Sequence, residues 1–87
     1  MAKYKITFKK SVTKDLRSIP NADIARLLER IDKLSDNPRA PGCIKLTGDN
    51  KYRVRQGIYR IIYQIRDNTL VINIVKIAHR SNVYKST

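Results

Sequence analysis

The chain has 87 residues, of which 19 are lysine or arginine and 7 are aspartate or glutamate, so its formal charge at pH 7 is +12. This length fits one domain, and a hydrophobic content of 41 % is enough to build one core, which excludes a disordered chain. So large an excess of positive charge repels itself, and the usual physical reason for it is an anionic partner. Residues 1–87 are therefore predicted to form a single domain that binds RNA, DNA or an acidic protein.

Other classes of protein are disfavoured by what the sequence lacks. No apolar run approaches the roughly 18 residues of a membrane-spanning helix, and the N-terminus MAKYKITFKK has no apolar signal segment. We therefore expect a cytoplasmic protein with no membrane partner. Cys43 is the only cysteine, so it is expected to be a small apolar residue rather than half of a disulfide. The acidic residues show no metal-ligand spacing, and we expect neither a metal nor another cofactor.

The N-terminal half predicts one strand followed by two helices. Alternating apolar residues predict a first strand at Tyr4, Ile6 and Phe8. A short helix, which Ser11 can cap, is predicted by apolar residues at helical spacing: Val12, Leu16 and Ile19. After Pro20-Asn21, a longer helix is predicted by an apolar stripe made of Ile24, Leu27, Leu28, Ile31 and Leu34. Asp36-Asn37-Pro38 ends this second helix.

The C-terminal half predicts three antiparallel strands in a meander. Ile44-Lys45-Leu46 leads into the turn sequence Gly48-Asp49-Asn50. The strands are expected at Lys51–Gln56, Ile58–Arg66 and Leu70–Ala78, with turns at Gly57 and Asp67-Asn68 and a short tail around Asn82–Ser86. The order β-α-α-β-β-β predicts an α+β domain in which the helical hairpin packs on one face of the sheet.

The predicted sheet has one apolar face and one basic face, because side chains at i and i+2 of a strand point the same way. The apolar face is expected to carry Tyr52, Tyr59, Ile61, Tyr63 and Ile65 beneath the helices. The open face is expected to carry Arg60 and a row formed by Lys51, Arg53 and Arg55. Neighbours in that row lie roughly 6.5–7 Å apart, which is close to the phosphate spacing of an extended nucleic-acid strand.

In this order and at this length, these segments resemble the RelE/ParE superfamily of bacterial and archaeal toxins, and its RelE-like branch in particular. The resemblance rests on the strand ending in Phe8, the helical hairpin, Lys45-Leu46, the segments 52–55 and 57–63, and His79-Arg80-Ser81-Asn82-Val83-Tyr84. It implies a toxin that cuts mRNA in the ribosomal A site without a metal, blocks translation, and is silenced by an acidic antitoxin.

Metal-free RNA cleavage defines what the site must supply. The 2′-hydroxyl attacks the adjacent phosphate and leaves a 2′,3′-cyclic phosphate and a 5′-hydroxyl. This reaction needs a group that accepts the 2′-proton, cations that stabilise the transition-state charge, and an acid that protonates the leaving oxygen. The sequence offers cations in abundance.

The resemblance implies catalytic roles for Arg60, Arg55, His79, Arg80 and Tyr84, and RNA binding by Lys51 and Arg53. Arg60 is expected to hold the scissile phosphate with its guanidinium fork. Arg53 and Arg55 are expected to dock the backbone and stabilise transition-state charge, and Tyr84 to stack on or orient a base.

This assignment of roles does not by itself identify the proton acceptor. Several relatives have lysine where Arg53 and Arg55 stand, and an arginine, with a pKa above about 12, is a poor base. His79 is the only side chain whose unperturbed pKa lies near neutrality, so it is the candidate for base or acid.

The sequence also allows other interpretations of these residues and of the function. His79 can be a structural hydrogen-bonding residue, and the arginines can form a solvated sheet surface. At the level of function, the alternatives are a ParE-like inhibitor of DNA gyrase without nuclease activity and a non-enzymatic nucleic-acid-binding module.

Overall fold

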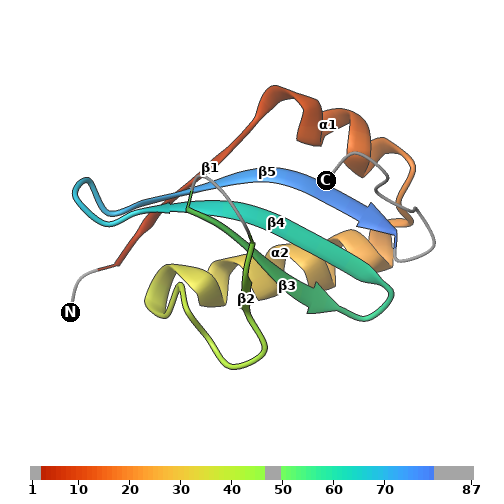
Figure 1. The fold of residues 1–87 in the computed structure, drawn as a ribbon. Helices are drawn as coiled ribbons and strands as arrows, with labels where there is room; N and C mark the ends of the chain where they lie inside the picture. Colours follow the sequence, from red (N-terminus) through yellow and green to blue (C-terminus); the bar gives the residue numbers. More distant parts are fainter. Residues whose placement is uncertain (1–2, 47–49, 80–87) are drawn as a thin grey trace.

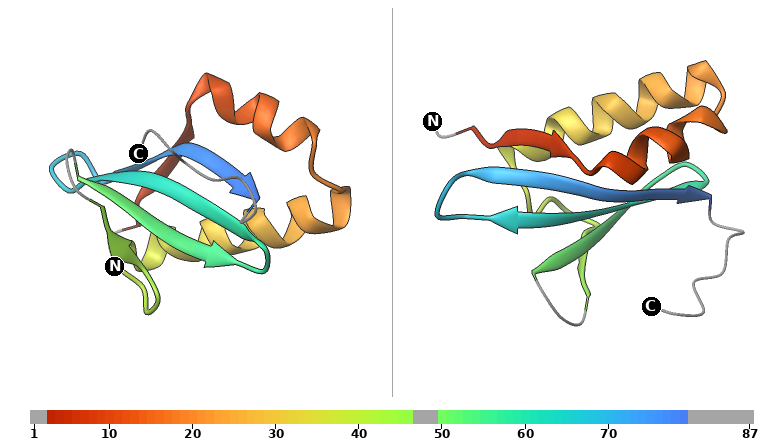
Figure 2. Two further views of the ribbon diagram at one scale, coloured as in Figure 1. Left: turned by 45° about the vertical axis from the view of Figure 1, so that its right-hand side comes forward. Right: turned by 90° about the horizontal axis from the view of Figure 1, so that it is seen from above.

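The computed structural model describes residues 3–46 and 50–79, which fold into two helices and one five-stranded sheet. The elements are β1 (Lys5–Phe8), α1 (Lys10–Arg17), α2 (Asn21–Asp36), β2 (Ile44–Lys45), β3 (Lys51–Gln56), β4 (Tyr59–Arg66) and β5 (Val71–His79). Both helices lie on one face of the sheet, and no helix of the described residues covers the opposite face (Figures 1 and 2). The predicted α+β architecture is confirmed.

The sheet is wider than the predicted meander. Its strand order is β1-β5-β4-β3-β2, with β1 parallel to β5 and the other neighbours antiparallel. The first strand thus joins the sheet, where it covers backbone groups of β5 that would otherwise lie open at an edge. The β3–β4 turn is the two residues Gly57 and Ile58, and Gly57 takes a φ of +60°, which suits a tight hairpin turn.

The core forms where α2 packs against the apolar face of the sheet. The predicted apolar set of β3 and β4 is buried, namely Tyr52, Tyr59, Ile61, Tyr63 and Ile65. On α2 the stripe is narrower than predicted, because Leu27, Ile31 and Leu34 are buried whereas Leu28 is 43 % exposed. Leu28 points away from the narrow line along which this helix meets the sheet.

A β-bulge and a helix contact determine how β5 ends. Ile62 pairs with Lys76 but the next residue, Tyr63, pairs with Ile74, so Val75 is an extra residue in β5. Beyond the end of β1, the edge of β5 faces α1, where the Asp15 carboxylate accepts the Ile77 N–H at 3.2 Å and lies 3.5 Å from Lys76 Nζ. Helix α1 therefore blocks this edge of the sheet and holds the end of β5 in place.

No helix in the described parts of the chain is both long enough and apolar enough to span a membrane.

Candidate active site on the open sheet face

The described residues of β3 and β4 place five cations on the open face, namely the four predicted ones and Arg66 at the end of β4. The register places Lys51 opposite Gln64, Arg53 opposite Ile62, and Arg55 directly opposite Arg60. Because directly paired residues point the same way, Lys51, Arg53, Arg55 and Arg60 form one surface, here called the basic face. The predicted placement of these four residues on one face is confirmed.

No carboxylate on the described strands neutralises the basic face. The five strands contain no aspartate or glutamate in their described residues. The carboxylates of residues 3–46 and 50–79 lie on the helices, at Asp15, Asp23, Glu29, Asp32 and Asp36, and in the β4–β5 turn, at Asp67. The described carboxylates thus lie away from the basic face, which keeps its positive charge available to an anionic ligand.

Two guanidinium groups of the basic face have unused hydrogen-bond donors. Within the described residues, the Nε atoms of Arg53 and Arg60 are buried and have no hydrogen-bond partner. A buried donor without a partner is costly, and so is a pair of like charges directly opposite each other, as Arg55 and Arg60 are. Phosphate oxygens at the accessible ends of these guanidinium groups would neutralise the repulsion.

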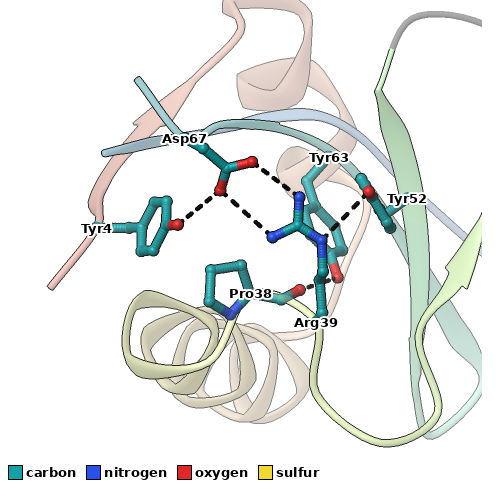
Figure 3. Close-up of polar contacts among 6 residues, drawn as sticks. All are labelled: Tyr4, Pro38, Arg39, Tyr52, Tyr63 and Asp67. Atoms are coloured by element: carbon teal, nitrogen blue, oxygen red, sulfur yellow. Dashed lines mark hydrogen bonds and ion pairs between the residues drawn. The ribbon is translucent and has the colours of Figure 1, made fainter. Parts of the chain in front are cut away.

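A polar network on the other side of β3 holds the strand in position (Figure 3). Tyr52, which lies between Lys51 and Arg53 in the chain, accepts a hydrogen bond from Arg39 Nε at 3.3 Å. The Tyr52 ring also stacks on Tyr63, with centroids 5.9 Å apart, and the Tyr63 hydroxyl donates to the Pro38 carbonyl at 2.7 Å. Tyr52 is therefore fixed from two sides, and the cations next to it in the strand are positioned by this anchor.

Arg39 and Asp67 join that network to the β4–β5 turn. Arg39 donates to both carboxylate oxygens of Asp67, at 2.9 and 3.3 Å, and the Tyr4 hydroxyl donates to Asp67 at 2.7 Å (Figure 3). Arg39, followed by Tyr4, holds the pKa of the Asp67 carboxyl below its usual value. The pairing of Arg39 with Asp67 was not predicted from the sequence, because the two residues lie 28 positions apart and share no local motif.

The lowered pKa of Asp67 predicts that the folded domain becomes less stable in acid. A carboxyl with a lowered pKa in the folded state stabilises the fold above its unfolded pKa of about 3.9 and loses that contribution as the pH falls through its folded pKa. Asp67→Asn is therefore expected to lower the free energy of unfolding at pH 7 and to lower it by less near pH 2. Urea unfolding at both pH values measures this, with the exposed Asp36→Asn as the control. An equal effect of Asp67→Asn at both pH values would contradict it.

His79 does not lie beside Arg60. The register pairs His79 with Tyr59, on the face that the helices cover, whereas Arg60 is on the basic face. The His79 ring meets the Tyr59 ring edge-on, with centroids 5.7 Å apart, and the Tyr59 hydroxyl donates to Asp23 of α2 at 3.1 Å.

The structure thus brings Lys51, Arg53, Arg55 and Arg60 together and places His79 on the other side of the sheet. Arg80 and Tyr84 lie outside the described residues.

The described residues contain no group of three or more histidine, cysteine, aspartate or glutamate side chains that could hold a metal ion. Cys43 is a half-buried free thiol that packs against the core.

Residues 6–84 match the family model of the ParE toxin of the type II toxin–antitoxin system parDE. The chain belongs to the RelE/ParE toxin family. It is 35 % identical over 88 residues to a protein of Methanocaldococcus jannaschii whose name assigns it to the RelE toxins, a match that covers 97 % of this chain and 98 % of that protein.

Two solved structures show the same fold in RelE toxins. The toxin is similar to a chain of the archaeal RelE–RelB complex from Pyrococcus horikoshii, with 36 % identity, a TM-score of 0.81, and coverage of 95 % of this chain and 100 % of that one. It is also similar to a chain of the toxin–antitoxin complex RelBE2 from Mycobacterium tuberculosis, with 26 % identity, a TM-score of 0.82, and coverage of 94 % and 97 %. The predicted family and the predicted role as the toxin of a toxin–antitoxin system are confirmed.

Proposed function

We propose that this toxin is a ribosome-dependent endoribonuclease that cleaves mRNA in the ribosomal A site without a metal and so blocks translation in the cytoplasm. The observation that carries the proposal is the basic face, where two buried guanidinium donors have no partner among the described residues and two arginines are directly opposed. Such a surface is complementary to a phosphodiester, and the similarity to RelE toxins supports mRNA as the substrate.

In the proposed reaction, Arg60 holds the scissile phosphate and Arg55, directly opposite, adds the second positive charge. The 2′-hydroxyl loses its proton as its oxygen forms a bond to phosphorus, and the bond to the 5′-oxygen breaks as that oxygen takes up a proton. The products are a 2′,3′-cyclic phosphate and a 5′-hydroxyl, with no net change in the number of protons. Negative charge on the phosphoryl oxygens rises in the transition state, and the fixed guanidinium groups stabilise that charge without rearranging. Lys51 and Arg53 bind the flanking phosphates along β3. Arg80 and Tyr84 keep their proposed roles as a further cation and a stacking residue.

Dependence on the ribosome follows from the chemistry of the basic face. Arginine is a poor proton acceptor, and the basic face contains three arginines and one lysine. A site rich in charge but poor in bases gains most from a partner that holds the 2′-hydroxyl in line with the phosphate, because alignment alone supplies a large part of a rate enhancement. The ribosome is proposed to provide this alignment.

The position of His79 leads to a prediction about proton transfer. A general base must come within hydrogen-bond reach of the proton it accepts, and His79 contacts Tyr59 on the helix side of the sheet. We therefore expect His79→Ala to leave the shape of the pH–rate profile near neutrality unchanged in single-turnover cleavage on programmed ribosomes. A profile that flattens in the variant would restore His79 as the proton-transfer residue. Tyr59→Phe is the matched control, since it alters the same cluster without removing a group that titrates near pH 7.

The partner that silences the toxin is proposed to be an acidic antitoxin of the RelB kind. The similar archaeal and mycobacterial chains were solved in complexes with antitoxins. A formal charge of +12 makes an acidic protein the physically matched inhibitor. A small neighbouring gene that encodes an acidic protein, and whose product reverses growth arrest, is the expected confirmation.

Primer extension on mRNA from cells that express the toxin tests the proposed function. Cuts in register with codons are expected within translated regions, and the same cuts should appear on purified programmed ribosomes. Robust cutting of ribosome-free RNA would contradict ribosome dependence. DNA damage without RNA cuts would instead indicate gyrase inhibition, and salt-sensitive RNA binding with neither effect would indicate a passive binding module.

A further inference from the structure

A ladder of polar side chains crosses the open face next to the basic face. The register pairs Lys51 with Gln64, Gln64 with Asn73, and Asn73 with Thr7, so one residue comes from each of β3, β4, β5 and β1. Asn73 Nδ2 donates to Gln64 Oε1 at 3.4 Å, and Thr7 Oγ1 donates to Asn73 Oδ1 at 3.0 Å. These bonds fix the orientation of the Gln64 amide. Within the described residues, the Gln64 Nε2 group donates no hydrogen bond to the protein.

A recess of about 290 Å³ opens beside this amide. It is lined by Asn50, Gln64, Ile65 and Arg66. Two backbone groups of the lining are already bonded to each other, because the Asn50 carbonyl accepts a hydrogen bond from the Ile65 N–H at 3.3 Å. The recess therefore offers two neutral amides and a guanidinium group.

These groups match a nucleobase better than a phosphate. A phosphate is bound most strongly by cations, whereas the edge of an unstacked base presents neutral donors and acceptors that amide side chains pair with. A guanidinium plane such as that of Arg66 can also stack on the flat face of a base.

The distance from the proposed cleavage site agrees with this assignment. Gln64 follows Arg60 by four residues on the same strand and on the same face. Four residues of strand span about 13 Å, or two steps of the phosphate spacing along an extended RNA. A base about two nucleotides from the phosphate held by Arg60 would therefore reach the recess.

We propose that Gln64, oriented by Asn73 and Thr7, recognises one base of the bound RNA in this recess and determines which sequences the toxin prefers. This inference rests on the proposed function, because it assumes that the basic face binds an RNA strand. It adds a base-reading site to a surface that otherwise contacts only the backbone.

The test compares cut-site preferences of four proteins on ribosomes programmed with mRNAs randomised around the A-site codon. Gln64→Ala is expected to reduce the discrimination among bases at one position near the cut by at least about fivefold, the effect of losing one bidentate contact. Lys51→Ala, on the same rung of the ladder, should lower cutting of all sequences alike. Gln56→Ala changes a glutamine that pairs with Tyr59 on the helix side, so it should match the wild type. Identical base preferences in Gln64→Ala and the wild type would overturn the inference.

Equilibrium binding separates failure of this inference from failure of the proposed function. Fluorescence anisotropy with eight-nucleotide RNAs that differ at single positions should show a base preference in the wild type that Gln64→Ala loses. If no RNA is cut but this preference is found, the nuclease proposal fails and the recess proposal stands. Equal affinity for all oligonucleotides in the wild type would overturn the recess proposal. Asn73→Ala, which frees the Gln64 amide to rotate, should weaken the same preference and serves if Gln64→Ala unfolds.

Discussion

Replacing Arg60 with alanine is expected to lower the single-turnover rate of mRNA cleavage on programmed ribosomes by about 10²- to 10³-fold, the usual effect of removing one fixed transition-state donor. Arg60 is the residue proposed to hold the scissile phosphate, and its Nε has no partner among the described residues of the free protein. The loss should therefore appear in the chemical step and not in folding.

The same substitution is expected to keep or raise the stability of the domain. Arg60 lies directly opposite Arg55, and like charges in that position destabilise a sheet, by an amount within the roughly 0.2–1 kcal/mol range of cross-strand pairs. Thermal unfolding of Arg60→Ala should therefore occur at the wild-type temperature or slightly above it. A residue whose removal stabilises the fold and abolishes activity is retained for function.

Two control variants make the result specific. Arg60→Lys keeps the charge but loses the fork that binds two oxygens at once, so an intermediate rate is expected. Arg26→Ala removes an exposed arginine from α2, on the helix side, and should cut RNA at the wild-type rate. Unchanged cleavage by Arg60→Ala would remove Arg60 from the proposed site.

The sequence predicted the faces of β3 and β4 correctly because both strands alternate without interruption. Tyr52 and Val54 of β3 and Ile61 and Tyr63 of β4 are buried, as period-2 alternation requires. Placing Arg53, Arg55 and Arg60 on one surface needed only this rule and the two-residue turn between the strands.

The position of His79 could not be derived in the same way, because the bulge in β5 reverses the alternation. Without an extra residue, Ile72 and Ile74 on the core side would place Lys76 on the core side and His79 on the open side. Because Val75 is inserted, Ile77 returns to the core and His79 faces the helices beside Tyr59. The sequence did contain an indication of the bulge, because strict alternation would have buried Lys76 and exposed Ile77.

Contacts between residues far apart in the chain could not be predicted from the sequence either. The Arg39–Asp67 pair forms only because the α2–β2 loop and the β4–β5 turn meet in space, and neither residue belongs to a local pattern. The parallel pairing of β1 with β5 depends in the same way on how the helical hairpin returns the chain across the sheet.

Binding of single-stranded RNA to the toxin is expected to weaken about 50-fold when the salt concentration rises from 50 to 200 mM. Four phosphate contacts, by Lys51, Arg53, Arg55 and Arg60, give a slope of about −2.8 in a plot of log K against log salt concentration, at about −0.7 for each contact on a single strand. Fluorescence anisotropy with a short RNA measures this slope.

The slope also identifies which cations contact the phosphates. Arg55→Gln should reduce its magnitude by about 0.7, because one released counterion is lost, whereas Arg26→Gln on α2 should leave it unchanged. If both variants keep the wild-type slope, the phosphates are bound elsewhere, and the cations of α1, Lys10, Lys14 and Arg17, become the surface to test. The described strands contain no carboxylate, whereas α1 carries Asp15 among its cations, so the positive potential that attracts phosphates is expected to be stronger at the basic face. The salt slope is therefore expected to depend on the basic face and not on α1.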